Sequence, residues 1–467
     1  MLFPDPDKLN QLAPTEVLEA AARGHLGLDH RFLRALIDRS DQALPAAITF
    51  ARRDRSEDAV DLAPELIALF RYWNTPDAIP FLVAYIKEDP ENVPDEALEA
   101  LVAIGKPALE PLLALYGELD ESASGEVSFV LSSLGVRDKR ILDLLVERLE
   151  YDLSDTVLLL GIYGDPAAIP VLEKAARVPG EPEADLKKEI ADTLETLRNP
   201  AAQTSADEGE RFDIWNLYPE TDELPMDLLD EDDRVELLNH SVPSVRAAAA
   251  HSFFNQELTA EGRSKLLDRA QHDPEPEVRA RAWEALINST EQSEVVEAML
   301  TALRKQDLPV EERGGLLVGL APEADRNEVR DAITAHYSRI DGRAKALEAM
   351  WRSMHPAFRD NFAKHLDDSD VEVKRGAIWG VGYYGLKSEL ERLRGIFSDE
   401  ELRSDALFAY ALVLPSDLSR GRMKSLFSRI EKDAKGLTEM EEELVKAALD
   451  ERLMLAGKEP VFRQQED

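Results

Sequence analysis

The stretch Asp273-Pro-Glu-Pro-Glu-Val-Arg-Ala-Arg-Ala-Trp-Glu-Ala-Leu-Ile287 decides the fold of this 467-residue chain. Its prolines suit the first turn of a helix, and the residues after them place apolar side chains at the i, i+3, i+4, i+7 spacing of an amphipathic helix. Val278 is followed directly by Arg279, and a small residue, Ala282, stands four positions after the valine. We therefore predict a helix here, with its small residue facing the core.

The same order of residue types returns along the second half of the chain. Val245-Arg246 precedes Ala249, and Val373-Lys374 precedes Ala377. With looser copies between and after them, the small residues stand at positions 249, 282, 314, 346, 377 and 406, which are 33, 32, 32, 31 and 29 residues apart. A period near 31 residues predicts an array of repeated units.

The first half of the chain contains a similar repeated pattern. Ala97, Val127 and Thr156 take the place of the small residue, and a glycine follows each of them eight residues later, at positions 105, 135 and 164. Glycine at the end of a helix supplies a left-handed C-cap. In Gly164-Asp165-Pro166 a capping Asp then precedes a first-turn Pro. Each unit is thus predicted to be two helices of about three turns, with no strand pattern between them.

An array of helix pairs forms an α-solenoid, in which neighbouring units cover one another's apolar faces. Residues 164–177, Gly-Asp-Pro-Ala-Ala-Ile-Pro-Val-Leu-Glu-Lys-Ala-Ala-Arg, and residues 273–287 resemble short bacterial HEAT repeats, the type also found in phycobilin lyase subunits. The resemblance covers residues 42–200 and 234–456. It implies an all-α solenoid of HEAT-like helical hairpins in two arrays.

The resemblance also implies a structural ladder of hydrogen bonds along the stack. In the family, an Asp in the turn within each repeat and an Arg six residues later are the members of this ladder. Asp273 with Arg279 and Asp368 with Lys374 match the spacing, whereas several other units lack one member. We therefore expect an incomplete ladder.

The repeat breaks at residues 201–233, an acidic insert in which Arg211 is the single basic residue. The insert also contains Phe212, Trp215 and Tyr218. Dense like charge opposes collapse, so we interpret the insert as a solvated or partly packed crossing between two arrays. The alternative is that its aromatic cluster docks on the C-terminal array as a pseudo-ligand. The other predicted segments are an N-terminal helical cap, the two arrays and a polar tail, at residues 1–41, 42–200, 234–456 and 457–467.

Charge and composition restrict the function. The net charge of -38 repels nucleic acids and anionic lipids, and it favours protein partners with basic or mixed-charge segments. Cysteine is absent, and no apolar run approaches the roughly 20 residues that span a bilayer, so we expect a cytoplasmic protein without a membrane contact. The sequence contains no HExxH, GxSxG or P-loop motif. We predict no enzyme activity, no catalytic residue, no cofactor and no metal site.

Partner binding is expected on the second helix of each unit, which lines the concave face of HEAT proteins. The position before each small residue should be exposed there. It is acidic in the N-terminal array, at Glu96, Glu126 and Asp155, and basic in the C-terminal array, at Arg281, Arg313 and Lys345. Because packed helices repeat about 10 Å apart, these candidate partner-binding residues would form an acidic and a basic ridge. The alternative is that they serve solubility alone.

Aromatic residues occupy the position two residues after the small one. They are Phe129, Trp379 and Phe408, and Tyr383 and Tyr384 lie one turn past Trp379. Aromatic side chains are common anchors of protein interfaces, so Trp379, Tyr383 and Phe408 are further candidates for partner binding. The alternative is packing between units.

We therefore predict a non-catalytic protein-binding scaffold or assembly factor that grips a partner segment along its concave face. Two alternatives stay open. The resemblance to phycobilin lyases suggests a lyase-like or chaperone-like helper of a cofactor-bearing protein. Nucleic-acid binding, as in HEAT-like DNA glycosylases, is supported by the basic ridge but opposed by the net charge.

Overall fold

The computed structural model describes residues 3–53, 60–90, 92–121, 123–176, 184–199, 212–221, 224–414 and 420–462. Within these ranges the chain forms helices and turns and contains no strand. The contacts divide the chain into two compact units, residues 1–221 and 222–467. The predicted all-α class is confirmed.

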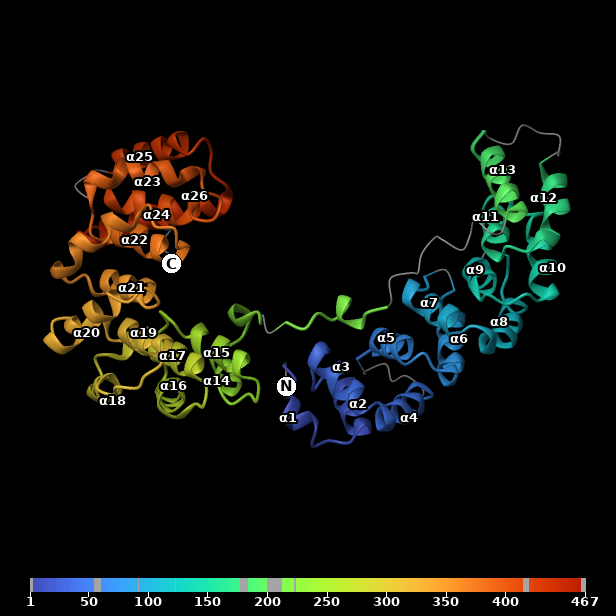
Figure 1. Ribbon diagram of the computed structural model, residues 1–467, viewed down its shortest axis with the longest axis horizontal. Coiled ribbons are helices and arrows are strands. Elements are labelled where there is room, and N and C mark those ends of the chain that lie inside the picture. Colours follow the sequence, from blue (N-terminus) through green and yellow to red (C-terminus); the bar gives the residue numbers. More distant parts are fainter. Residues whose placement is uncertain are drawn as a thin grey trace. The chain divides into compact units, whose positions relative to one another are not determined.

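The described ranges of the N-terminal unit form consecutive helices, many of them joined by short turns (Figure 1). Its α-helices are α1 (Pro6–Leu9), α2 (Pro14–Ala22), α3 (His30–Ile37), α4 (Ser40–Ala51), α5 (Ala63–Trp73), α6 (Ile79–Glu88), α7 (Asp95–Ile104), α8 (Leu109–Tyr116), α9 (Gly125–Ser133), α10 (Lys139–Arg148), α11 (Leu153–Tyr163), α12 (Ile169–Ala175) and α13 (Ala184–Arg198). Its 3-10 helices are η1 (Pro76–Ala78), η2 (Lys106–Ala108), η3 (Pro166–Ala168) and η5 (Ile214–Asn216).

The C-terminal unit is built in the same way. Its α-helices are α14 (Glu231–Leu237), α15 (Pro243–Ser252), α16 (Ala260–His272), α17 (Pro276–Ala285), α18 (Ser293–Leu303), α19 (Val310–Gly319), α20 (Asn327–Tyr337), α21 (Arg343–Ser353), α22 (Val371–Tyr383), α23 (Leu390–Gly395), α24 (Arg403–Val413), α25 (Arg420–Asp433) and α26 (Glu439–Leu455). Its 3-10 helices are η6 (Met226–Leu228), η7 (Leu286–Ser289), η8 (Ala321–Glu323), η9 (Pro356–Asn361), η10 (Ala363–His365), η11 (Lys387–Glu389) and η12 (Ile396–Ser398).

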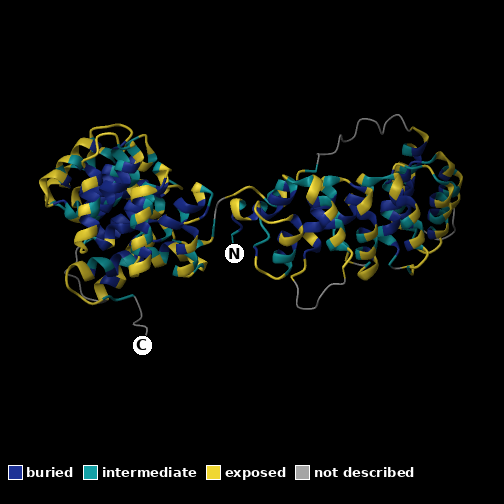
Figure 2. Cartoon of the chain, turned by 90° about the horizontal axis from the view of Figure 1, so that it is seen from below, coloured by how far each residue is buried: buried dark blue, intermediate teal, exposed yellow. Residues whose placement is uncertain are grey.

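The helices stack in chain order as two layers in each unit. In the N-terminal unit α5, α7, α9, α11 and α13 pack on one another in succession, and α6 packs on α8. In the C-terminal unit the corresponding succession is α15, α17, α19, α21, α22, α24 and α26. Figure 2 shows buried residues along the interior of each unit and exposed residues on its outside. This is the predicted solenoid of HEAT-like helical hairpins.

The predicted helix ends are present in the N-terminal unit. Gly105, Gly135 and Gly164 have φ angles of 73°, 67° and 65°, the left-handed region that only glycine adopts at low cost. After Gly164, the Asp165 carboxylate accepts a hydrogen bond from the backbone N–H of Ala167, and Pro166 opens the next helix. These caps turn the chain sharply between one helix and the next.

The structural ladder runs between successive repeats, and Asp273 and Arg279 belong to it. Arg246 donates two hydrogen bonds to the Asp273 carboxylate of the next repeat, at 2.8 and 2.9 Å. Arg279 donates to the backbone carbonyl of Asp273 at 2.6 Å and to the carboxylate of Glu312 at 2.9 Å. Each arginine therefore closes its own turn through a carbonyl and reaches forward to the acid of the following repeat.

The other two expected members of the ladder, Asp368 and Lys374, also do not pair with each other. Lys374 forms an ion pair with Asp399, not with Asp368. The Asp368 carboxylate instead pairs with His365 and accepts a hydrogen bond from the backbone N–H of Asp370. Arg403 and Glu441 continue the forward pairing, at 2.6 Å. The ladder thus joins successive repeats because the basic side chain is long enough to cross to the next turn.

Two glycines bring α17 and α19 into backbone contact. A Cβ atom added at Gly315 would lie 2.3 Å from the carbonyl oxygen of Ala280, and one added at Gly319 would lie 2.3 Å from that of Trp283. The inner helices therefore approach more closely than side chains would permit. The same unit brings Asn255, which follows α15, within 3.2 Å of Arg352 on α21, so the inner side of this array is tightly curved.

A buried histidine lies beside this contact. His336 on α20 is 2% exposed, and neither ring nitrogen has a hydrogen-bond partner among the described residues. Burial and the charges of Arg313 and Arg339 lower the pKa of His336 to about 4, while Asp341 opposes the shift. The imidazole is therefore neutral in the folded protein at neutral pH.

We expect Gly315→Ala to destabilise the protein by about 1–3 kcal/mol, because the added methyl group meets backbone atoms of α17 that cannot rotate away. Gly395→Ala is the matched control, since a Cβ there meets nothing within 4 Å. Alanine in place of that helical glycine should be neutral or stabilise slightly. Urea unfolding of the full chain measures both. Equal effects of the two substitutions would contradict the close approach.

We expect His336 to make stability fall as the pH drops from about 6.5 to about 4, because in that window the unfolded state binds a proton that the folded state does not. The loss should reach about 3 kcal/mol and then level off. His336→Gln should flatten this part of the pH profile, whereas His272→Gln, at a side chain that is 69% exposed, should leave it unchanged. Parallel profiles for wild type and His336→Gln in urea unfolding would refute the assignment.

Candidate functional site

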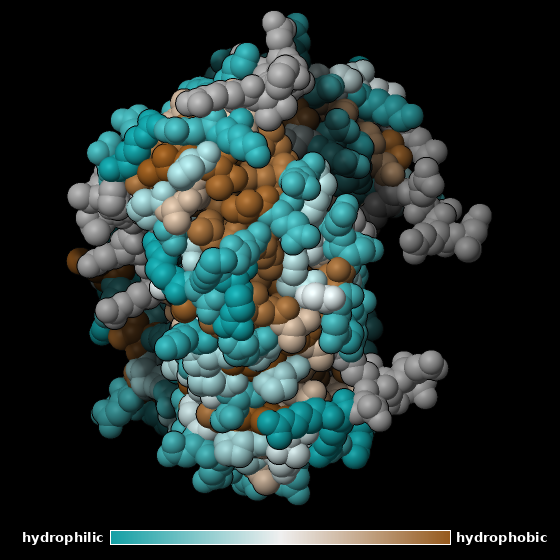
Figure 3. All heavy atoms as spheres, turned by 90° about the vertical axis from the view of Figure 1, so that its right-hand side faces the viewer, coloured by the Kyte–Doolittle hydropathy of each residue, from teal (hydrophilic) through white to brown (hydrophobic). Residues whose placement is uncertain are grey.

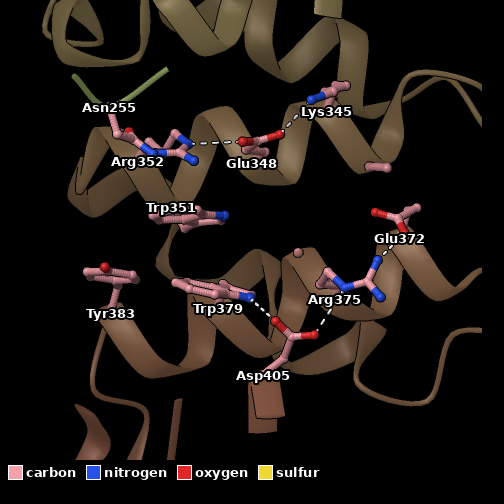
Figure 4. A pocket seen from close by; sticks show the side chains of 12 residues that line it. Asn255, Lys345, Glu348, Trp351, Arg352, Glu372, Arg375, Trp379, Tyr383 and Asp405 are labelled. Carbon is pink, nitrogen blue, oxygen red and sulfur yellow. Dashed lines mark hydrogen bonds and ion pairs between the residues drawn. The ribbon is translucent and has the colours of Figure 1, made fainter. Parts of the chain in front are cut away.

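The inner face of the C-terminal unit contains a pocket of about 490 Å³ (Figure 4). Its walls come from α21, α22 and the start of α24, and Asn255 approaches from the end of α15. The lining residues are Asn255, Ala344, Lys345, Glu348, Trp351, Arg352, Glu372, Arg375, Gly376, Trp379, Tyr383 and Asp405. The small residues Ala344 and Gly376 leave room between larger side chains.

Stacked aromatic rings form one side of the pocket. The ring centroids of Trp351 and Tyr383 are 4.8 Å apart with planes 10° from parallel, and those of Trp351 and Trp379 are 5.4 Å apart at 26°. Trp379 also lies 4.8 Å from Phe408, which is buried behind it. The stack therefore spans three successive inner helices, α21, α22 and α24.

Hydrogen bonds hold the aromatic rings in place. The indole N–H of Trp379 donates to Asp405 at 2.7 Å, and the Tyr383 hydroxyl donates to Glu451 at 2.9 Å. Burial and the Glu451 carboxylate raise the pKa of Tyr383. The indole N–H of Trp351 donates to no described residue, and Figure 4 shows its nitrogen edge turned toward the space between Glu348 and Arg375. Trp351 thus offers a free hydrogen-bond donor to a ligand.

The charges around the pocket neutralise one another. Arg352 donates to Glu348 at 3.0 Å and stacks its guanidinium on Trp351 at 4.4 Å. Arg375 pairs with Asp405 at 3.1 Å and also with Glu372. Three cationic and three anionic side chains line the pocket, counting Lys345. The pocket is therefore polar at its rim, apolar along the stack and close to neutral.

The expected basic ridge of Arg281, Arg313 and Lys345 is not continuous. Arg281 pairs with Glu284 at 3.1 Å, and Lys345 pairs with the same Glu284 at 2.7 Å. Glu284 is 1% exposed, so a buried carboxylate neutralises both cations. Arg313 turns away and donates to the backbone carbonyl of Lys305 at 2.8 Å.

The tight curvature explains this correction. A Cβ atom at Gly314 would lie 2.9 Å from the Cβ of Lys345, so the missing side chain leaves a passage across α19. Through it Lys345 of α21 reaches Glu284 of α17, two inner helices away. The sequence analysis considered only neighbouring repeats, so it did not predict this contact between helices two repeats apart.

Sequence reasoning found Trp379, Tyr383 and Phe408 and the structure brings them together. It missed Glu348, Trp351 and Arg352 of α21, Glu372 and Arg375 of α22, and Asp405 of α24. The spacing contained a signal for part of this set, because positions one before, two after and six after the small residue share a helix face. Applied to Ala346 and Ala406, that rule selects Lys345, Glu348, Arg352 and Asp405.

In the N-terminal unit, residues 212–221 of the acidic insert pack on the array itself. Ile214 is fully buried in the core of this unit. The Phe212 ring lies 4.0 Å from the Arg71 guanidinium of α5, and the Trp215 ring lies 4.4 Å from that of Arg34 of α3. The aromatic cluster therefore docks on the N-terminal unit, so the alternative of docking on the C-terminal array is wrong, and the described part of the insert is packed. The part of the insert before Phe212 lies outside the described residues.

Tyr218 anchors the same segment. Its hydroxyl donates to the Glu65 carboxylate at 3.1 Å, and Glu65 is 7% exposed. Burial raises the pKa of Glu65, and the hydrogen bond from Tyr218 partly offsets that shift. Burial and the nearby Glu65 raise the pKa of Tyr218.

The acidic candidates lie on the inner helices of the N-terminal unit. Glu96 of α7 and Glu126 of α9 are half-buried, and Asp155 of α11 is exposed. Phe129 of α9 lines a cavity of about 570 Å³ together with Phe212 of the docked segment. None of these three acids lines that cavity.

The described ranges contain no group of three or more His, Cys, Asp or Glu side chains placed to hold a metal ion. Among the described helices, none is both long and apolar enough to cross a membrane. Figure 3 shows apolar surface running as a band through the otherwise polar face that it displays.

No protein-family model and no curated protein matches the sequence. Among solved structures, human deoxyhypusine hydroxylase in complex with glycerol is 16% identical over 62% of this chain and 98% of its own, with a TM-score of 0.22. An engineered protein is 16% identical over 83% of this chain and 98% of its own, with a TM-score of 0.21. The karyopherin Kap121p bound to the extreme C-terminus of the protein phosphatase Cdc14p is 13% identical over 94% of this chain and 57% of its own, with a TM-score of 0.30. These scores are too low to support a functional argument.

We expect Tyr218→Phe to cost about 1–3 kcal/mol of stability at neutral pH, because the buried Glu65 carboxylate loses its hydroxyl donor. The deficit should shrink as the pH falls, since a protonated Glu65 needs that donor less. Tyr72→Phe on α5 is the control, because Tyr72 is 44% exposed. Urea unfolding at two pH values tests this. A deficit that does not depend on pH would argue against the contact with Glu65.

Proposed function

We propose that this chain is a non-catalytic protein-binding scaffold of the HEAT-like kind, and that the inner face of its C-terminal unit grips an extended segment of a partner protein. The observation that carries the proposal is the stack of Trp351, Trp379 and Tyr383 along a pocket on that face. Rigid aromatic side chains with a polar rim are the common anchors of protein interfaces.

The pocket suits a side chain of a peptide better than a charged cofactor or a nucleic acid. Its cations are already paired with carboxylates, so they offer no excess positive charge to a phosphate. The free indole N–H of Trp351 suits a backbone carbonyl, which every peptide provides. The ring faces suit an apolar or planar side chain.

The scaffold is preorganised for this task. The hydrogen bonds from Trp379 to Asp405 and from Tyr383 to Glu451 fix two of the three rings before a partner arrives. Fixed side chains lose less conformational entropy on binding than free ones, so more of the contact energy appears as affinity. The three carboxylates that line the pocket, those of Glu348, Glu372 and Asp405, are each paired with an arginine. None of them is free to act as a general base, which favours binding over catalysis.

We expect Trp351→Ala to weaken binding of the native partner at least about thirtyfold, the loss typical of a central aromatic anchor. Trp351→Phe keeps a ring and should retain part of the affinity. Tyr72→Ala removes a 44% exposed aromatic side chain from the other unit and should have no effect.

The measurement is quantitative affinity purification from the native host with the wild type and the three variants, followed by titration of the recovered partner. Urea unfolding of each variant shows that the fold is intact. A stoichiometric partner that binds wild type and Trp351→Ala equally would overturn the role of the pocket. Recovery of no stoichiometric protein partner at low salt would overturn the scaffold itself.

A further inference from the structure

Three consecutive inner helices of the N-terminal unit contain no basic residue. They are α7 (DEALEALVAI), α9 (GEVSFVLSS) and α11 (LSDTVLLLGIY). Glu96, Glu126 and Asp155 occupy equivalent positions on these helices, and none of them forms an ion pair with a described residue. This face therefore keeps an uncompensated negative charge, unlike the balanced pocket of the C-terminal unit.

Apolar side chains are exposed on α11, three and seven residues after Asp155 and thus on the same face of the helix. Leu158 is 64% exposed and Ile162 is 39% exposed. In the repeat they correspond to Phe129 and Ser133 of α9, which line the cavity of about 570 Å³. The cavity thus marks the start of an apolar strip that continues along α11.

The neighbouring part of the same array already holds a segment from elsewhere in the chain, which includes the 3-10 helix η5. Residues 212–221 contact α3 and α5 through Trp215 and Tyr218, and Phe212 forms a wall of the cavity beside Phe129. Arg71, the cation at this edge, is covered by Phe212 and paired with Glu99. The described part of this segment begins at Phe212, which shares a cavity wall with Phe129, the first position of the apolar strip.

We propose that the inner face of α7, α9 and α11 binds a basic, apolar segment of a partner protein, seated against Phe212. Its apolar side chains cover Phe129, Leu158 and Ile162, and its Lys or Arg side chains pair with Glu96, Glu126 and Asp155. This surface lies in the other unit from the aromatic pocket and takes a partner of different chemistry. It goes beyond the proposed function and does not depend on it.

Charge complementarity selects this occupant. An acidic face repels nucleic acids and anionic membranes, and it attracts cationic peptides from a distance. Apolar contact at the centre with ion pairs around it gives both affinity and register. An acidic segment of similar shape would place like charges against one another and is rejected.

The test uses the full chain and two fluorescein-labelled synthetic peptides, (Leu-Lys-Ser)5 and (Leu-Glu-Ser)5, in fluorescence anisotropy titrations. The basic peptide should bind at least tenfold more tightly than the acidic one, with an affinity that falls as salt is raised. Failure of the wild type to bind the basic peptide would overturn the proposal. Equal binding of both peptides would do the same.

Matched variants separate this surface from general attraction to an acidic protein. The double substitution Glu126→Lys with Asp155→Lys should lower the affinity for the basic peptide at least tenfold. Glu147→Lys, at an exposed position of α10, should change that affinity less than twofold. The double substitution Leu158→Ser with Ile162→Ser should also lower the affinity for the basic peptide at least tenfold. Ile340→Ser, at a side chain that is 84% exposed in the other unit, should leave that affinity unchanged. Equal losses in test and control variants would overturn the site.

A second copy of this chain could also occupy this face. Sedimentation of the wild type and of Leu158→Ser with Ile162→Ser measures this self-association. A monomer in both cases supports a separate partner. A wild-type dimer that these substitutions dissociate would overturn the proposal, because the face would then serve contact between copies of this chain.

Discussion

The close approach of neighbouring inner helices is the constraint on which the rest of the structure depends. A helix pair of this length cannot bury its apolar face alone, so each repeat must be covered by the next. The small residue at the centre of each inner helix permits that contact. In α19, Gly315 and Gly319 have no side chain at this contact, so the backbone of α19 lies directly against the carbonyl oxygens of α17.

The residues at these contacts give the two inner faces their different character. In the C-terminal unit the glycines draw the inner helices together until side chains two helices apart meet, as Lys345 and Glu284 do. Charges are paired within the unit, and aromatic rings from three helices stack into a rigid surface. In the N-terminal unit the positions equivalent to Gly315 are Ser128 and Val157, and Glu96, Glu126 and Asp155 form no ion pair with a described residue.

The sequence predicted what depends on periodicity. The small residues at 97, 127 and 156 and at 249 to 406 mark the inner helices correctly, and Gly164 with Asp165-Pro166 ends one helix and begins the next. Trp379, Tyr383 and Phe408 were found because they share one position of the repeat. Arg313 was misplaced because its guanidinium caps the carbonyls that follow α18, a choice between two partners that no spacing encodes. Ile214 was missed as a core residue because its contacts come from helices far away in the sequence.

Uncompensated charge on the N-terminal inner face follows from the same geometry. Like charges that repeat along a stack repel one another, so such a ridge lowers stability unless an opposite charge lies nearby. The C-terminal unit removes this cost internally, with Glu284 between Arg281 and Lys345. In the N-terminal unit, Glu96, Glu126 and Asp155 form no ion pair with any residue of the described ranges, and Leu158, on the same helix as Asp155, is 64% exposed. Both departures, unpaired acids and exposed apolar surface, are relieved by one kind of occupant, a segment that is basic and apolar at once.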